Sequence, residues 1–315
     1  MITLRYHIVS IAAAFLALAV GVVLGSTTLS GTLLSGLADD NSELASRVSE
    51  LETERNALQA RLADADGFAS SVGPRVVSDR LDERSVVLFT TEEADPTDRD
   101  AIADLIEDSG ARVTGEVRLS DAFADPAKSD RLVDIVTRLQ PSGTELPTSG
   151  GPGRLAGSLL GQTLLLDAES ADEQASSDEQ AAVLRGLAEG GFVEADEDVE
   201  PAQLAVVLTG GESEGDGAGD RAATVARFAV GMDKSGAGTV LAGAAGSASG
   251  NGPVGVVRAD SSASGVLSTV DNAHTAAGRV TTVLALREQL EGEAGQYGIA
   301  GNAGAPAPGA GSSGS

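Results

Sequence analysis

The chain opens on an apolar run that is long enough to cross a membrane. No charged residue occurs from Ile8 to Leu24, and the first acidic residue after this run is Asp39. A helix rises 1.5 Å per residue, so a charge-free stretch of this length spans the roughly 30 Å hydrocarbon core. The basic leader, with Arg5 and His7, predicts a cytoplasmic N-terminus. Residues 1–36 are therefore predicted to be a single-pass anchor in the cytoplasmic membrane, with the rest of the chain extracytoplasmic.

A cleaved secretory signal peptide is the alternative interpretation of the same run. Gly25 and Ser26 are small enough for a cleavage site. Against cleavage, apolar residues continue through Leu29 and Leu33, and a regular helical pattern begins at once. We therefore expect the anchor to be retained.

Leucines then recur every seven residues, at Leu37, Leu44, Leu51 and Leu58. This spacing predicts a coiled-coil stalk over residues 37–66 that joins two parallel copies of the chain. The other core position of the heptad holds Asn41, Val48, Arg55 and Leu62. The predicted interface residues are Leu37, Asn41, Leu44, Val48, Leu51, Leu58 and Leu62. The alternative is a single amphipathic helix that packs on its own domain, which usually carries a wider apolar stripe.

Residues 67–300 alternate between strand-like apolar runs and amphipathic helices. Residues 85–91, 112–119, 204–209, 239–243 and 254–260 are predicted to be strands, and residues 98–109, 181–189, 224–232 and 279–290 are predicted to be helices. This alternation predicts an α/β fold, a three-layer extracytoplasmic domain with a mostly parallel sheet. Residues 301–315 consist almost entirely of Gly, Ala, Pro and Ser, which predicts a disordered tail.

Composition excludes several classes of function. The chain has no cysteine, so it has neither disulfides nor thiolate metal ligands. The formal net charge is −26, which repels phosphate backbones, and aromatic residues make up only 3% of the chain. We therefore expect no nucleic-acid partner.

One segment matches a catalytic motif. Residues 211–215, Gly-Glu-Ser-Glu-Gly, fit the G-x-S-x-G nucleophile elbow. Two glutamates flank Ser213 and would oppose a developing negative charge, so an acidic surface loop is the preferred interpretation. The same loop is rich in oxygen ligands but lacks the Asp/Asn ladder of a calcium-binding EF-hand. We predict a non-enzyme with no catalytic residues.

Candidate ligand sites are few. The turns at Thr90–Thr91 and Thr209–Gly211 follow predicted strands, at the edge where α/β sheets usually bind ligands. His274 is predicted to be a loop or cap residue, and His274 and Met232 are the histidine and methionine beyond the anchor. Copper(I) prefers several thiolate or thioether ligands, and copper(II) prefers several imidazoles. We therefore predict no metal ligands and no bound cofactor in a single chain.

Nearly all of the chain except its C-terminal tail resembles a known family. The segments that carry the resemblance are residues 1–37, the heptads that follow, residues 74–91 (PRVVSDRLDERSVVLFTT), 206–211 (VVLTGG), 225–230 (VARFAV), 238–243 (GTVLAG) and 268–290 (STVDNAHTAAGRVTTVLALREQL). They are similar to the actinobacterial copper transporter family, which is named after MctB and includes SteB-like proteins. The resemblance implies an anchored envelope protein with a role in copper efflux or resistance. Its alternative implication is a non-enzymatic scaffold for cell separation beside a SteA-type membrane partner. Copper itself is implied only by this resemblance.

Overall fold

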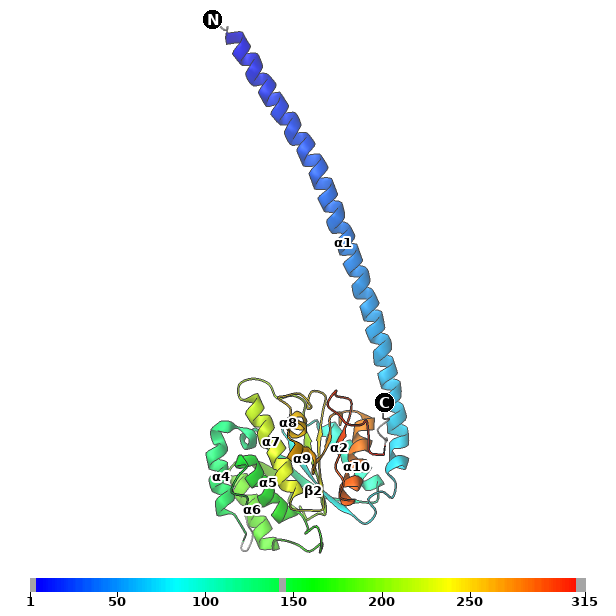
Figure 1. Cartoon of the computed structure of the whole chain (residues 1–315), viewed down its shortest axis with the longest axis vertical. Coiled ribbons are helices and arrows are strands. Elements are labelled where there is room, and N and C mark those ends of the chain that lie inside the picture. Colours follow the sequence, from blue (N-terminus) through cyan, green and yellow to red (C-terminus); the bar gives the residue numbers. More distant parts are fainter. Residues whose placement is uncertain (1–3, 142–145, 310–315) are drawn as a thin grey trace. The chain divides into compact units, whose positions relative to one another are not determined.

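The chain forms two compact units, Met1–Ala65 and Asp66–Ser315, in the computed structural model. The structure describes residues 4–141 and 146–309, with the backbone alone for residues 26–40. The first helix, α1 (Leu4–Val77), contributes residues to both units. Figure 1 labels α1 and most of the helices of the second unit and colours the chain from its N-terminus to its C-terminus.

The first unit is helical throughout its described part. It contains an apolar segment, Leu4–Gly25, that by length and composition can cross a membrane. The prediction of one N-terminal apolar helix is thus confirmed, whereas its orientation stays a prediction. The predicted interface residues from Asn41 to Leu62 are exposed in this chain, and the side chain of Leu37 lies outside the described residues.

The second unit is built on a seven-stranded sheet in the order β3-β2-β1-β4-β5-β6-β7. All neighbouring strands are parallel except β2 and β3, which are antiparallel. The α/β class and the mostly parallel sheet are therefore confirmed. The strands are β1 (Ser85–Thr91), β2 (Arg112–Leu119), β3 (Val193–Ala195), β4 (Leu204–Thr209), β5 (Thr239–Gly243), β6 (Ser268–Val270) and β7 (Gln296–Tyr297).

The order of the strands follows from the chain path. The chain passes from β1 to β2 on one side and later returns to β4 on the other side of β1. The register between β1 and β2 shifts where Val86 pairs with Val113 but Leu88 pairs with Glu116. Gly115, with φ of 137°, supplies the conformation that this bulge needs.

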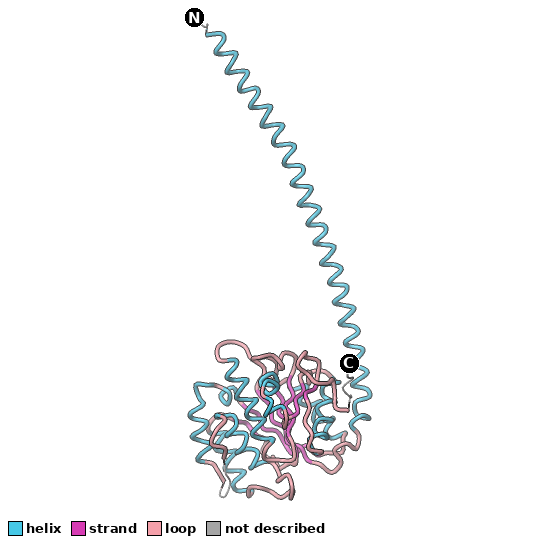
Figure 2. Tube along the Cα trace, in the orientation of Figure 1, coloured by secondary structure: helices cyan, strands magenta, loops and turns pink. Residues whose placement is uncertain are grey.

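Helices cover both faces of the sheet. They are α2 (Pro96–Asp108), α3 (Asp121–Ala124), α4 (Ser129–Arg138), α5 (Gly151–Leu164), α6 (Ser177–Glu189), α7 (Ala218–Asp233), α8 (Pro253–Ala259), α9 (Ser261–Ser264) and α10 (Ala276–Leu290), with a 3₁₀ turn at Pro126–Lys128. Figure 2 shows the strands between the two groups of helices, and Figure 1 labels α5 and α7 in one group and α2 and α10 in the other.

Successive side chains of the central strands point to opposite faces of the sheet, so the apolar core consists of two clusters, one on each face. In β1, Val87 and Phe89 belong to the core cluster under α5 and α7, whereas Val86 and Leu88 belong to the cluster under α2 and α10. A strand that is buried on both faces reads as a continuous apolar run, which explains the sequence SVVLFTT.

The last turns of α1 belong to the second unit and pack on its second core cluster. Val77 is fully buried, and a Cβ on Gly73 would come within 2.8 Å of the Val280 side chain. The carboxylate of Asp66 accepts a hydrogen bond of 2.6 Å from the backbone N–H of Ala276, at the first turn of α10. This carboxylate satisfies an amide that the helix itself leaves without a partner.

The prediction of a strand at residues 254–260 is wrong, because residues 253–259 form helix α8. Pro253 occupies the first helical turn, where its missing N–H costs nothing. Val254 and Val257, three residues apart, are both buried, as one face of a helix requires.

The C-terminal segment also differs from expectation. Residues 301–309, predicted to be disordered, are described, and Ala305 pairs with Tyr297 as an isolated bridge. Backbone hydrogen bonds join Gly298 to Ala305 and Gly304 to Gln296. Specific polar contacts therefore hold a segment that has too few apolar residues to order itself by burial. Residues 310–315 lie outside the described residues.

Candidate functional site

The crevice expected at the carboxyl edge of the sheet lies where the strand order reverses, between β1 and β4. Thr91 and Thr209 end these two strands, and their hydroxyl oxygens are 3.4 Å apart. Both threonines line the same small cavity. Two turns that lie far apart in the sequence thus meet at the topological switch point, as α/β architecture predicts.

This cavity is narrow. Its free volume is about 20 Å³, roughly the space of one water molecule. Arg221 on α7 lines it, but its guanidinium donates to the backbone carbonyls of Asp216, at 2.7 Å, and of Glu214. The arginine therefore holds the acidic loop after β4 through two of its N–H groups.

Ser213 also lines the cavity, on the loop that precedes α7. The helix begins at Ala218, so the serine does not lead directly into a helix as an elbow nucleophile does. Among the described residues that line the cavity there is no histidine to act as a base. The geometry supports an acidic loop rather than a hydrolase site.

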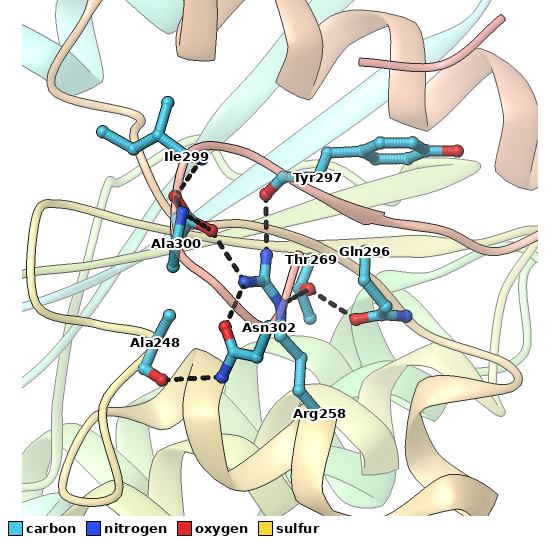
Figure 3. A network of polar contacts seen from close by, with 9 residues as sticks. Ala248, Arg258, Thr269, Gln296, Tyr297, Ile299, Ala300 and Asn302 are labelled. Atoms are coloured by element: carbon cyan, nitrogen blue, oxygen red, sulfur yellow. Dashed lines mark hydrogen bonds and ion pairs between the residues drawn. The ribbon is translucent and has the colours of Figure 1, made fainter. Parts of the chain in front are cut away.

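A second polar cluster lies at the carboxyl end of β6. Arg258 on α8 forms an ion pair of 2.7 Å with Asp271, and the two side chains are only 3% and 2% exposed. Figure 3 shows how the guanidinium is surrounded: it also donates to the Thr269 hydroxyl, at 2.9 Å, and to the Tyr297 carbonyl, at 2.6 Å. The Asn302 amide oxygen accepts a further bond of 2.9 Å.

Asp271 holds the C-terminal segment from the other side of the pair. Its carboxylate accepts from the backbone N–H of Ile299, at 2.8 Å, and from that of Ala300, at 3.3 Å. The amide nitrogen of Asn302 in turn donates to the Ala248 carbonyl. Arg258 and Asp271 thus fasten residues 296–302 to the end of the sheet through bonds to groups of the protein itself. The sequence interpretation missed this cluster, although a single arginine inside the apolar run VGVVRAD signals a buried carboxylate partner.

Several carboxylic and phenolic groups have shifted pKa values. Burial raises the pKa of Asp98, although Arg279, at 2.8 Å, acts in the opposite direction. Burial raises the pKa of Asp233 to about 7, while a hydrogen bond from the Thr239 N–H opposes the shift. Burial and the hydrogen bond to Glu288 raise the pKa of Tyr297. These three groups lie at separate places and form no shared reaction centre.

The second unit contains one thioether ligand, Met232, and one imidazole ligand, His274, and the two do not share a site. Met232 is fully buried in the core between α7 and the sheet. His274 is exposed, and its Nδ1 accepts a 3.2 Å hydrogen bond from the Ala245 N–H, so the neutral ring carries its proton on Nε2. No group of three or more His, Cys, Asp or Glu side chains suited to a metal ion occurs among the residues that the structure describes.

Comparison with known proteins adds what the geometry alone does not provide. The sequence model of the family described as "Copper transport outer membrane protein, MctB" matches residues 1–308. The chain is 39% identical to the copper transporter MctB of Mycobacterium tuberculosis (strain H37Rv) over 303 residues, covering 95% of this chain and 96% of that protein. It is also 39% identical to the copper transporter MctB of Mycobacterium leprae over 307 residues, with the same coverage.

These relatives are named as copper transporters and not as enzymes. Their names give no support to the alternative of a SteB-like role in cell separation. The SteA-type partner and the exclusion of nucleic acid stay predictions from the sequence.

Proposed function

Because the chain belongs to the MctB family of copper transport proteins, we propose that it takes part in copper efflux as a membrane-anchored protein of the cell envelope. The observation that carries this proposal is the match over residues 1–308, supported by identity of 39% across 95% of the chain. So long a match covers the apolar helix, the heptads and the α/β unit together.

We propose a single membrane pass with the α/β unit outside the cytoplasm. The apolar segment Leu4–Gly25 is one helix, and the described residues contain one such segment. Arg5 and His7 lie at its N-terminal end, and Asp39 and Asp40 lie after it. This distribution favours a cytoplasmic N-terminus.

The proposed role is accessory: copper crosses the envelope in an assembly, not through one copy of this chain. The described sheet is open, with β3 and β7 at its edges, and helices cover its faces. An open sheet edge in lipid leaves backbone groups without hydrogen bonds, at several kcal/mol each. A single apolar helix does not enclose a channel either.

The stalk is proposed to join two copies of the chain. The heptad leucines from Leu44 to Leu58, with Val48 and Leu62, present an apolar stripe to solvent in the single chain. A second parallel copy that buries this stripe is the arrangement that strict a/d spacing favours.

Copper content of cells tests the proposed function. A bacterium that lacks its own MctB relative is complemented with the full chain, or with the α/β unit exported behind a cleavable signal. We expect the full chain to lower cell-associated copper, measured by mass spectrometry, under copper stress. Copper levels equal to those of the uncomplemented strain, with the protein present in the envelope, would reject the role in efflux.

A further inference from the structure

The apolar stripe on α1 is a surface without a partner in the single chain. The side chains of Leu44, Val48, Leu51, Leu58 and Leu62 are between 50% and 70% exposed. Together with Asn41 and Arg55, these residues form what we call the seam. Exposed leucines that repeat along one helix face mark an interaction surface rather than scattered surface residues.

Two polar core residues restrict which helix fits the seam. In a parallel pair, the side chain at an a position inserts beside the a residue and the preceding g residue of the facing helix. Arg55 at a then lies beside Arg55 and beside Glu54 at g of the second copy, and the two Glu54 carboxylates offset the repulsion between the two arginines. Within its own chain, the described contact of the Arg55 guanidinium is with the amide oxygen of Asn56, at 3.3 Å.

The other charges agree with the same arrangement. Arg47 at g faces Glu52 at the next e position of a parallel second copy, a pairing that favours association. Asn41 meets Asn41 of the second copy only when the two helices are in register. In an antiparallel pair, a positions lie opposite d positions, so Asn41 and Arg55 would each be buried against leucine without a polar partner.

The seam has a defined end. Continuing the heptad places Ala69 and Val72 at core positions, but both are partly buried within the second unit. Gly73 and Val77, on the adjoining part of the same face, are buried there as well. Beyond Leu62 the helix surface is therefore increasingly used by the chain's own domain.

We propose that the seam, from Asn41 to Leu62, selects a second copy of this chain in parallel and in register, with the pair formed by Arg55 and Glu54 of the second copy setting the register. This inference rests on the parallel dimer of the proposed function and adds its register and the residues that set it.

Disulfide trapping in the full chain, purified in detergent, tests orientation. The chain has no cysteine, so Leu44→Cys and Ser46→Cys each carry a single thiol. Leu44 is at d near the N-terminal end of the seam, whereas Ser46 is at f on the opposite side. We expect diamide to cross-link Leu44→Cys roughly tenfold more than Ser46→Cys, because a parallel pair in register places the two copies of residue 44 within disulfide reach, whereas an antiparallel pair separates them by roughly 16 Å or more along the helix. Equal cross-linking would overturn the proposal.

Charge exchange tests recognition. Glu54→Arg and Arg55→Glu each place like charges across the seam, and we expect the dimer dissociation constant to rise roughly threefold to tenfold for each. The double exchange should restore the affinity, and Glu50→Arg, at an outer c position, should leave it unchanged. If the losses of dimer affinity in the two single variants simply add in the double variant, Arg55 does not pair with Glu54 of the second copy.

The outcomes of these experiments distinguish a failure of this inference from a failure of the proposed function on which it rests. A stable dimer that does not cross-link at Leu44 would contradict the parallel, in-register arrangement but not the dimer itself. A monomer in native mass spectrometry would contradict the proposed dimer. The role in copper efflux is tested separately, by the copper content of cells.

Discussion

At the scale of residues, the stability of the fold depends on the buried ion pair of Arg258 and Asp271. Asp271→Asn leaves the arginine buried without a counter-charge, so we expect the free energy of unfolding to fall by about 3–5 kcal/mol. Glu291→Gln is the matched control, because its ion pair with Arg287 is about half exposed and should be worth no more than about 0.5 kcal/mol. Urea denaturation followed by circular dichroism measures both. Similar losses in the two variants would show that the pair does not fasten the C-terminal segment.

Asp233 gives a stability effect that depends on pH. Its pKa is about 7 in the folded protein, against 3.8 for the ordinary group, because burial disfavours the carboxylate. Between these values only the folded protein holds the proton, so stability falls as the pH rises from about 4 to about 7. Asp233→Asn keeps an acceptor for the Thr239 N–H and removes this fall, with a gain of up to roughly 4 kcal/mol at pH 8. Denaturation at several pH values checks this, and parallel profiles of the two proteins would contradict it.

At the scale of elements, close approach of backbones joins α5 to α7. A Cβ on Gly157 would collide with the carbonyl oxygen of Phe228, and one on Gly153 with that of Thr224. Gly157→Ala should therefore push the helices apart and cost about 2 kcal/mol or more. Gly67→Ala, on an open face of α1, should be neutral or stabilising by up to about 1 kcal/mol. Thermal melting of both variants checks this, and a neutral Gly157→Ala would show that the helices separate freely.

The elements that the sequence predicts differ from those that it misses in how far their formation depends on distant contacts. The runs SVVLFTT and LAVVLT are rich in β-branched residues, so β1, β4 and the meeting of Thr91 with Thr209 were predictable. Helix α5 was not, because GPGRLAGSLLGQTL has the glycine content of a loop, and its tertiary packing on α7 overrides that propensity. The sequence predicts a strand where helix α8 lies, because a short apolar run does not distinguish the helical period from that of a strand. The cluster around Asp271 depends on contacts between distant segments, which no local pattern contains.

At the scale of the whole molecule, segments with different proposed roles follow one another along the chain. The apolar helix, the seam and the α/β unit follow one another, and Asp66 marks the start of the second compact unit. In the second unit, Arg221 and Arg258 each donate hydrogen bonds to groups of the protein itself. The C-terminal segment to residue 309 belongs to this unit through Ala305 and Asn302.

Copper affinity tests the accessory role directly. Met232 is buried, and His274 is a single exposed imidazole whose Nδ1 already accepts a hydrogen bond from the Ala245 N–H. Copper(I) prefers several soft ligands, so we expect the purified full chain to bind it no tighter than about micromolar in competition with a chromophoric chelator. His274→Ala should leave both this affinity and, within about 1 kcal/mol, the stability unchanged, because the side chain is exposed. Nanomolar affinity that His274→Ala abolishes would instead make the chain a direct copper carrier, and the site would then have to be shared between the two copies of a dimer, since one chain offers a single accessible imidazole in its α/β unit.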